Sequence, residues 1–587
     1  MKNTKAKLLA AALLGLACAV PAVSAAPAMA AGYLAPAKQA ITILPINRAK
    51  FLKGQKFDLC VEIPGGTTEM KVAINGKDAE EFFGAKAERK VEGGDIATYR
   101  IDGVAFDAAG DIAVSVADGE KTREIKYTVT DAVAPTIAKN VILFIGDGMS
   151  LQAREMGRIL SKGITEGKYN DLLNMEKLSD MALITTSGYD SIVTDSANSA
   201  SAYSTGHKSV VNAMGVYENC TPDPLDDPKV ENIVELAKRI RGMATGIVST
   251  ANITDATPAA MVAHTRRRAE QNYIAENMFS EEHRPDVILG GGSRHFIPMS
   301  TPGSKRKDET DVIKMFEGAG YAFSGTATEL KASTADKLIG LFQLNNMDVY
   351  IDRAVIKDPK VLKGFDDQPN LMEMTSKAID VLSKNPNGFF LMVEGACIDK
   401  QLHVLDWQRA TYDTIEMDKA IGIAQEFAAK NNDTLIIVVA DHAHGASITG
   451  TYHTLDGKAG REAVRTYAAA GWPTFQDADG DGFPDDPNPA VTLAVQFANH
   501  PDCNENYTFK PVPTVPAVMA DGKAIANPKI PGELLRGNIP SNADQEVHSA
   551  DDILLNAGGP GADYFHGVMD NTEVFFGIVR ALGLANK

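Results

Sequence analysis

Positive charge is what this sequence most clearly lacks. The 587-residue chain carries 58 lysines and arginines against 76 aspartates and glutamates, which gives a formal net charge of −18. Because nucleic acids and anionic membranes select basic surfaces, this balance disfavours both as main partners, and we expect no nucleic-acid-binding role. An acidic balance is compatible with cation binding, but most of these side chains are expected to form an ordinary solvated surface.

Long hydrophobic runs, glycine and proline are also scarce. After the first thirty residues no apolar run is long enough to span a bilayer, so we expect no transmembrane helix. The 50 glycines and 28 prolines are too few to indicate disorder over long stretches. With 44% hydrophobic residues the chain can form a sizeable core, and its length predicts a large domain with at least one accessory module.

Cysteine is rare as well. Five are present, and four of them follow the first thirty residues: Cys60, Cys220, Cys397 and Cys503. Four cysteines permit three pairings, and their spacing does not choose among them, although an exported protein can oxidise them. Cys397 lies inside one of the motifs described below, where we expect a buried free thiol.

Residues 1–30 have the order of a cleavable signal peptide. A basic start precedes an apolar stretch over residues 8–20, and small residues follow up to Ala30. Cleavage is acceptable after Ala25 or after Ala30. A lipoprotein signal through Cys18 is the weaker alternative. The sequence therefore predicts a periplasmic or secreted protein.

The pattern over residues 40–133 predicts short strands. Apolar and polar residues alternate over 57–63 and 111–116, and turns such as Asn75-Gly76 separate these stretches. Regular spacing of this kind predicts an all-β, immunoglobulin-like β-sandwich, linked to the rest of the chain by residues 131–139. No catalytic constellation is visible in this module, and its role is open.

From residue 140 to 587 the pattern changes to strands that alternate with helices. Apolar runs that end at polar or glycine-rich positions are typical of buried parallel strands, and they cover residues 141–145, 244–249, 286–289, 388–393 and 434–440. Helical stretches such as 230–240 and 372–382 lie between them. The prediction is an α/β fold with a doubly wound, mostly parallel central sheet and an insertion at about 446–545. Reactive groups are then expected at the carboxyl ends of the strands.

Ligand-type side chains follow three of these predicted strands. One aspartate stands between two glycines, an Asp-His pair ends the last strand, and a glutamate ends a third, with an aspartate and a histidine four residues apart on the next helix. A turn or a surface pair explains each feature alone, but not their recurrence at three strand ends. Carboxylates and imidazoles together suit Zn²⁺. The residues are Asp147, Glu394, Asp399, His403, Asp441 and His442.

Ser196 is the fourth feature. It lies among small and hydroxyl residues that precede a helix-forming run, so we expect it at a helix N-terminus. Backbone N–H groups and the helix dipole there favour an anionic oxygen or a phosphate. An ordinary serine cap is the alternative for an isolated Asp-Ser pair.

With these features in place, the sequence resembles the alkaline phosphatase family, close to its bacterial periplasmic members. Five segments match in the family order, and a more degenerate one follows. They are residues 145–149 (IGDGM), 194–197 (TDSA), 255–259 (DATPA), 393–403 (VEGACIDKQLH), 440–444 (ADHAH) and 546–548 (EVH). The resemblance covers roughly residue 140 to the C-terminus, and the N-terminal module is an addition to the usual bacterial pattern.

The resemblance implies a role for each matched position. Ser196 would be the nucleophile that becomes phosphorylated and is then hydrolysed. Three groups of metal ligands are implied: Asp399, His403 and His548 for one Zn²⁺; Asp147, Asp441 and His442 for a second; and Asp147, Thr257 and Glu394 for a Mg²⁺. His444 would orient a ligand rather than bind metal itself.

The resemblance also implies how substrate is held. Asp255 and Lys400 match positions that contact metal-bound or phosphate-bound water, and Arg268 matches the phosphate-binding arginine, although Arg266 and Arg267 are close neighbours. The planar fork of an arginine can bind two phosphoryl oxygens at once. The implied activity is hydrolysis of small-molecule phosphate monoesters at alkaline pH, by a homodimer.

A second kind of metal site is suggested by an acidic loop. Asp477, Asp479, Asp481 and Asp485 repeat the carboxylate spacing of a calcium loop, with Gly482 at the sharp turn. The bidentate glutamate of an EF-hand is missing, because Asn488 occupies its place. The loop therefore either binds a structural Ca²⁺ or is an acidic surface loop.

Two other functions are weighed against the phosphatase. A phosphodiesterase, nucleotide pyrophosphatase or sulfatase of the same superfamily keeps the metal ligands but usually changes the nucleophile and the groups that grip substrate. Ser196, Thr257, Glu394 and Arg268 together favour the monoesterase. A secreted calcium-stabilised binding protein, built on the β-module and the acidic loop, is the alternative outside enzymes.

Overall fold

The computed structural model describes residues 41–133, 138–166, 168–448, 451–452, 464–465, 495–498, 518–520, 523–525 and 545–584. The predicted signal peptide and the acidic loop from Asp477 to Asp485 lie outside these residues. So do Cys503 and most of the predicted insertion.

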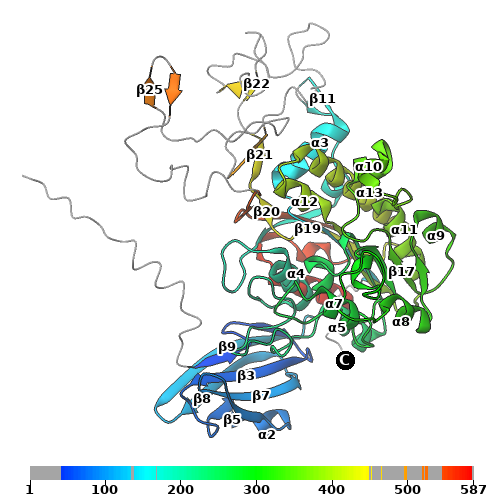
Figure 1. Cartoon of the computed structure of the whole chain (residues 1–587). Coiled ribbons are helices and arrows are strands. Elements are labelled where there is room, and N and C mark those ends of the chain that lie inside the picture. The colour runs from blue at the N-terminus through cyan, green and yellow to red at the C-terminus, as the bar shows by residue number, and fades with distance from the viewer. Residues whose placement is uncertain are drawn as a thin grey trace, which may run out of the picture.

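Two sheets form the N-terminal part of the chain, drawn in blue in Figure 1. One is antiparallel and has the order β1 (Thr42–Leu44), β3 (Phe57–Pro64), β7 (Ile96–Val104) and β6 (Glu88–Glu92). The other has the order β2 (Lys50–Leu52), β9 (Lys121–Thr130), β8 (Gly110–Asp118), β4 (Lys71–Ile74) and β5 (Lys77–Asp78). A short helix, α2 (Ala79–Phe83), follows β5, so this part of the chain is not purely β.

The two N-terminal sheets share one hydrophobic core. Alternate residues of β9 are buried, as expected when one face of a strand packs on a core and the other meets solvent. At the centre of this core the ring of Phe51 lies 4.6 Å from that of Phe57 and 5.2 Å from that of Phe106, measured between centroids. Tyr217 and Val230, from later in the chain, belong to the same core.

Buried hydrogen bonds join these sheets to the rest of the protein. The side-chain amide of Gln55, which is fully buried, donates to the carbonyl oxygens of Thr205 at 2.8 Å and Glu231 at 3.1 Å. Phe57 also forms a β-bridge with Val230. Because a buried donor or acceptor left unpaired is costly, these bonds fix how the sheets sit on the following domain.

A ten-stranded sheet forms the centre of that domain. Its order is β16 (Ala322–Ser324), β17 (Leu338–Leu341), β15 (Val287–Gly291), β14 (Ala244–Asn252), β18 (Phe389–Gly395), β10 (Asn140–Gly146), β19 (Thr434–Ala440), β28 (Ile553–Gly558), β13 (Asp180–Thr185) and β29 (Gly567–Asp570). Neighbouring strands are parallel except at β28, which is antiparallel to both of its neighbours. The prediction of a large, mostly parallel central sheet is confirmed.

The register of the central strands aligns their carboxyl ends. Gly146, the last residue of β10, pairs with Gly395 of β18 on one side and with Ala440 of β19 on the other. All three strands are buried along their whole length, which explains their near-continuous apolar runs. Side chains that follow these strands therefore emerge at one edge of the sheet.

Two groups of helices pack against the sheet. The first contains α3 (Leu151–Lys162), α11 (Leu371–Leu382), α12 (Cys397–His403) and α13 (Trp407–Asn431), and the second α4 (Ser196–Thr205), α5 (Ile233–Arg241), α6 (Ala256–Ala259) and α16 (Thr572–Leu582). Shorter helices lie toward the β16 edge: α7 (Gln271–Asn277), α8 (Val312–Gly318), α9 (Ala327–Ala332) and α10 (Pro359–Leu362). Helix α5 begins at a capping box between Asn232 and Glu235 and ends at Gly242 in the left-handed conformation.

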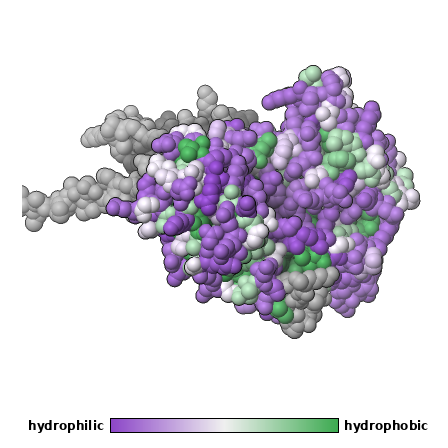
Figure 2. All heavy atoms as spheres, turned by 90° about the horizontal axis from the view of Figure 1, so that it is seen from below, coloured by the Kyte–Doolittle hydropathy of each residue, from purple (hydrophilic) through white to green (hydrophobic). Residues whose placement is uncertain are grey.

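Small strand pairs bring distant segments together at the carboxyl edge. β20 (Ala443–His444) pairs with β27 (His548–Ser549), and β21 (Ala446–Ile448) pairs with β24 (Val495–Phe497). None of the described helices is long and apolar enough to cross a membrane. On the face seen in Figure 2, hydrophobic residues form small separate patches in a mostly hydrophilic surface.

Candidate active site

The Ser196 hydroxyl lies at the first residue of α4. Asp195 caps this helix by a capping box with Asn198, which is why the helix begins here rather than earlier in the chain. Ser196 is buried, and its Oγ lies 3.3 Å from Asp147 Oδ1 and 3.2 Å from His442 Nε2. The predicted position at a helix N-terminus is confirmed.

Asp147, Asp441 and His442 form a buried group beside this serine. Their ligand atoms lie within 4.8 Å of one another, and His442 Nε2 is 3.4 Å from Asp147 Oδ1 and 3.5 Å from Asp441 Oδ2. Asp441 Oδ1 accepts from the backbone N–H of Gly148 and of His442, at 3.0 and 2.9 Å. Asp441 Oδ2 is buried and has no hydrogen-bond partner among the described residues, so it is free for a cation.

Gly148 lets the Asp147 group lie close to a second group, which contains Asp399 and His444. Its φ is +63°, and a Cβ there would lie 3.1 Å from the Asp399 side chain and from the His444 ring. A side chain at this position would be strained in its backbone and crowded by both neighbours. A glycine is therefore required after Asp147 if the two groups of ligands are to lie this close together.

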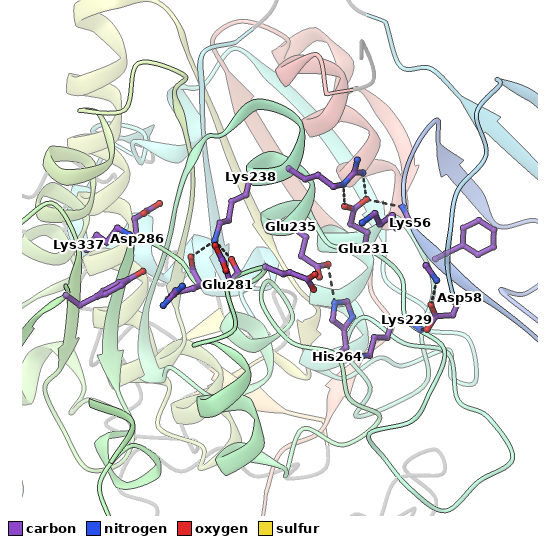
Figure 3. A pocket seen from close by; sticks show the side chains of 16 residues that line it. Lys56, Asp58, Lys229, Glu231, Glu235, Lys238, His264, Glu281, Asp286 and Lys337 are labelled. Carbon is purple, nitrogen blue, oxygen red and sulfur yellow. Dashed lines mark hydrogen bonds and ion pairs between the residues drawn. The ribbon is translucent and has the colours of Figure 1, made fainter. Parts of the chain in front are cut away.

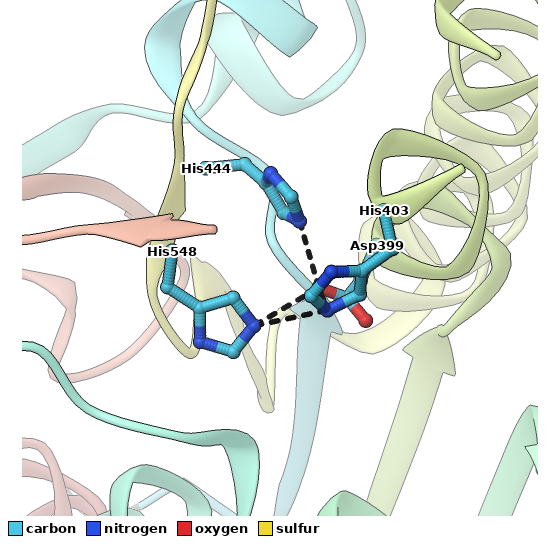
Figure 4. A group of neighbouring side chains, drawn as sticks. All are labelled: Asp399, His403, His444 and His548. Carbon is cyan, nitrogen blue, oxygen red and sulfur yellow. Dashed lines mark hydrogen bonds and ion pairs between the residues drawn. The ribbon is translucent and has the colours of Figure 1, made fainter. Parts of the chain in front are cut away.

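Asp399, His403, His444 and His548 form the second group (Figure 4). Asp399 and His403 share one face of α12, while the β20–β27 pairing sets His548 opposite His444. Asp399 Oδ1 lies 3.3 Å from His403 Nε2, 3.3 Å from His444 Nε2 and 3.5 Å from His548 Nε2. Three imidazoles from three segments thus surround one carboxylate oxygen.

The histidine tautomers fit a metal ion in this group. His403 Nδ1 lies 2.8 Å from the carbonyl oxygen of Glu546, and His548 Nδ1 lies 2.8 Å from that of Thr194. Because a carbonyl only accepts, each Nδ1 donates to it, which turns each Nε2 toward Asp399 as in a metal-ligating histidine. These two Nε2 atoms are only 3.1 Å apart, which a cation between them would stabilise.

The spacing of the ligand atoms also suits zinc. A tetrahedral ion with ligands at roughly 2.0–2.1 Å sets neighbouring ligand atoms about 3.3 Å apart. The separations in both groups, 3.1 to 3.5 Å, lie close to this value. Both groups therefore have the ligand types and the spacing of zinc sites.

Glu394, at the end of β18, is buried and feels the charge of Asp147, and Thr257 is buried on α6, which packs against β18. Burial, and then the charge of Asp147, raise the pKa of Glu394 well above its usual range. Thr257 Oγ1 is buried and has no hydrogen-bond partner in the described part of the chain. The side chain of Ser249 donates to Glu394 Oε2. A carboxylate and a hydroxyl in this setting are oxygen ligands of the kind that Mg²⁺ prefers.

Two basic side chains face these carboxylates. Lys400 Nζ lies 3.1 Å from Asp147 Oδ2, 3.3 Å from Asp399 Oδ2 and 3.6 Å from Asp255 Oδ2. Arg268 Nη2 donates to Asp255 Oδ1 at 2.8 Å, and Nη1 lies 3.3 Å from Asp195 Oδ2. Although burial opposes it, Lys400 and Arg268 lower the pKa of Asp255.

The geometry distinguishes Arg268 from its two neighbours. Arg266 donates to the carbonyl oxygens of Asn219, Thr221 and Asp223, so it holds a loop. Arg267 is exposed. Arg268 alone of the three contacts Asp195, the aspartate that caps the Ser196 helix. The sequence did not predict this contact, and the Asp195-Ser196 pair was the one local signal for it.

All twelve residues predicted for the site are found at this edge of the sheet. His444, predicted to orient a ligand, contacts Asp399, and Cys397 is a buried free thiol as expected. The arrangement can hold metal ions between carboxylates and imidazoles, next to a serine at a helix N-terminus and an arginine that bridges two aspartates. This set of side chains is typical of a metal-dependent hydrolase of anionic esters.

The comparisons with known proteins agree with this chemistry. A model of the alkaline phosphatase family matches residues 138–584. Alkaline phosphatase H of Pseudomonas aeruginosa is 36% identical over 366 residues, which are 56% of this chain and 74% of the relative. Alkaline phosphatase of Escherichia coli is 30% identical over 514 residues, which are 81% of this chain and 93% of the relative. The crystal structure of alkaline phosphatase from Thermus thermophilus has a TM-score of 0.55 and 25% identity, over 77% of this chain and 93% of that one.

The chain belongs to the alkaline phosphatase family. It is an enzyme, a phosphatase, and the resemblance inferred from the sequence motifs is confirmed. The family match begins at Ala138, after the last strand of the two N-terminal sheets.

Proposed function

We propose that this chain hydrolyses phosphate monoesters through a phosphoserine formed on Ser196. The observation that carries the proposal is the position of Ser196 Oγ, at the N-terminus of α4 and 3.2–3.3 Å from both a carboxylate oxygen and an imidazole nitrogen of one ligand group. In the first step Ser196 Oγ attacks phosphorus and the ester oxygen leaves as the alcohol. In the second step a water oxygen attacks phosphorus, the bond between phosphorus and Ser196 Oγ breaks, and inorganic phosphate leaves while Oγ is reprotonated.

Two Zn²⁺ and one Mg²⁺ are the proposed cofactors. Asp399, His403 and His548 would hold one zinc, Asp147, Asp441 and His442 the other, and Asp147, Thr257 and Glu394 the magnesium. Their unpartnered oxygens and 3.1–3.5 Å spacings support this assignment among the described residues. When bound, such ions lower the pKa of coordinated hydroxyl groups and stabilise the charge on the entering and leaving oxygens.

Arg268 would bind the phosphoryl group. Its fork faces Asp195 and Asp255 in this structure, within the same site as Ser196, and it can exchange one or both contacts for two phosphoryl oxygens. The backbone N–H groups at the start of α4 would add to this grip. Lys400 and Asp255 would hold a water on the phosphate, because both lie at the junction of the ligand groups.

The remaining expectations are proposals about the setting of the enzyme. Residues 1–30 would be a signal peptide that delivers it to the periplasm or outside the cell, and the active form would be a homodimer. Residues 40–133 would form an immunoglobulin-like module, which the common core of the two N-terminal sheets supports, and this core also includes Tyr217 and Val230 of the following domain. The acidic loop from Asp477 to Asp485 would hold a structural Ca²⁺.

The test is hydrolysis of p-nitrophenyl phosphate at alkaline pH by wild type and Ser196→Ala, before and after EDTA and readdition of Zn²⁺ and Mg²⁺. We expect loss with EDTA, recovery with metal, and a drop of several orders of magnitude in the variant, because the covalent route is closed. Wild-type turnover in Ser196→Ala would refute the phosphoserine.

A companion assay uses bis-p-nitrophenyl phosphate. Monoester turnover is expected to exceed diester turnover, because Arg268 and the proposed metal ions would together bind the doubly charged phosphoryl group of a monoester more tightly than the singly charged group of a diester. The reverse order would favour the phosphodiesterase alternative.

A further inference from the structure

A third group of metal-type side chains lies outside the active site. Glu235 is in the first turn of α5, His264 lies in the segment between α6 and Arg268, and His283 lies in the turn between α7 and β15. One ligand atom from each residue lies within 4.8 Å of the other two. Both histidines are buried, with exposed fractions of 3% and 5%. The sequence motifs of the family use none of these residues.

The two distances from Glu235 to its histidines lie in the range of the active-site groups, and each histidine faces a different carboxylate oxygen. His264 Nε2 lies 3.1 Å from Glu235 Oε2, and His283 Nδ1 lies 3.3 Å from Glu235 Oε1. A tetrahedral zinc with ligands at roughly 2.0–2.1 Å needs neighbouring ligand atoms about 3.3 Å apart. The carboxylate already stands between the two rings, whose centroids are 5.3 Å apart.

The orientation of His264 is that of a metal ligand. Its Nδ1 lies 2.8 Å from the carbonyl oxygen of Gly215, so Nδ1 donates there and Nε2 is directed at Glu235. His403 and His548 are held by backbone carbonyls in the same way in the active site. Gly215 is fitted to this contact, because its φ is +65° and a Cβ would lie 2.5 Å from His264 Nδ1.

His283 supplies an independent observation. Its Nδ1 is buried and has no hydrogen-bond partner within the described residues, although it faces Glu235 at 3.3 Å. A buried imidazole nitrogen without a hydrogen bond is costly, and a cation on it removes that cost. Without a metal ion, the same contacts would require a doubly protonated His264 paired with Glu235.

A cavity gives an ion access to this group. It has a volume of about 700 Å³ and is lined by Glu235 and His264 together with residues of β3 and of the loop before β15. Figure 3 shows the two side chains pointing toward one another within the wall of the cavity. Three protein ligands leave a fourth position of a tetrahedral ion open, and water from the cavity can fill it.

We propose that Glu235, His264 and His283 bind a zinc ion that is separate from the active-site metals. Two histidines and one glutamate are an established zinc ligand set. The ion would link helix α5 to the segment that ends at Arg268 and to the turn before β15. It would thereby stabilise the position of the segment that carries Arg268.

The deciding experiment is anomalous X-ray diffraction at the zinc edge on crystals of the full-length protein, supplied with stoichiometric zinc and dialysed against a weak chelator. We expect a peak between Glu235, His264 and His283 in addition to those of the active site. Peaks in the active site alone would overturn the proposal.

Metal analysis of His283→Gln provides a second readout. This variant is expected to hold one zinc per chain fewer than wild type, while His566→Gln, a change at an exposed histidine outside all three groups, keeps the wild-type content. Equal zinc in His283→Gln and wild type would contradict the proposal. If His283→Gln does not fold, the diffraction result on wild type still decides. Ser196→Ala is expected to retain this zinc, which separates the site from catalysis.

Discussion

Asp227 allows a quantitative test of how the burial of a carboxyl group changes the stability of this protein with pH. Its side chain is buried, and Oδ1 accepts from the Asn219 N–H at 2.9 Å. Oδ2 is buried without a hydrogen-bond partner in the described part of the chain, and Arg266 lies 3.6 Å from Oδ1. Burial, opposed by the Asn219 bond and by Arg266, raises the pKa of Asp227 to about 6.

The sign of the effect follows from the two pKa values. In the unfolded chain the carboxyl titrates near its ordinary value of 3.8. Below that pH both states are protonated and nothing is gained or lost. As pH rises from there to about 6 the folded state resists ionisation, and above about 6 it carries the full cost. At 1.36 kcal/mol per pKa unit, this cost is about 3 kcal/mol.

Asp227→Asn removes the charge and keeps the oxygen that accepts from Asn219. We expect the variant to be more stable than wild type by up to about 3 kcal/mol at about pH 8, but by less than about 1 kcal/mol at about pH 4. For a chain of this size the gain corresponds to a rise in Tm of about 2–3 °C. The assay is thermal unfolding of both proteins at the two pH values, so that the acid sensitivity of the metal ligands cancels in the difference.

Asp223→Asn is the matched control, because Asp223 lies on the same loop but is exposed. It is expected to change Tm little at either pH. A loss of stability in Asp227→Asn at about pH 8, or a gain as large at about pH 4 as at about pH 8, would refute the reasoning.

Two further predictions concern the site and the N-terminal sheets. Arg268→Ala should lower kcat/KM for p-nitrophenyl phosphate by about 100-fold or more, since two charge-assisted hydrogen bonds of roughly 1.5–3 kcal/mol each are lost, and Arg268→Lys should lie between it and wild type in steady-state kinetics. Unchanged kinetics in Arg268→Ala would exclude a phosphate-binding role. Gln55→Ala should destabilise the protein in thermal unfolding, because it leaves two buried carbonyl oxygens without their donor, at about 1–3 kcal/mol each. The partly exposed Gln152 gives the control, Gln152→Ala, and equal Tm values for the two variants would contradict the docking role of Gln55.

The sequence alone determined the strands and the ligands that follow them. The runs predicted at 141–145, 388–393 and 434–440 became β10, β18 and β19 within a residue or two at each end, because strands buried on both faces require continuous apolar residues. Asp147, Asp399 and Asp441 could be selected because each lies a few residues after such a strand. Their meeting at one edge follows from parallel pairing, which is a general property of this fold class.

Only the tertiary structure decided which distant residues meet. His548 reaches Asp399 because β27 pairs with β20 across more than a hundred residues, and Arg268 finds Asp195 across a span of 73. Glu235, His264 and His283 come from three separate segments, none of which carries a metal-binding motif. Such contacts depend on sheet register and on helix packing. Sheet register and helix packing are set by the whole core. The local spacing of hydrophobic residues along the sequence therefore does not determine them.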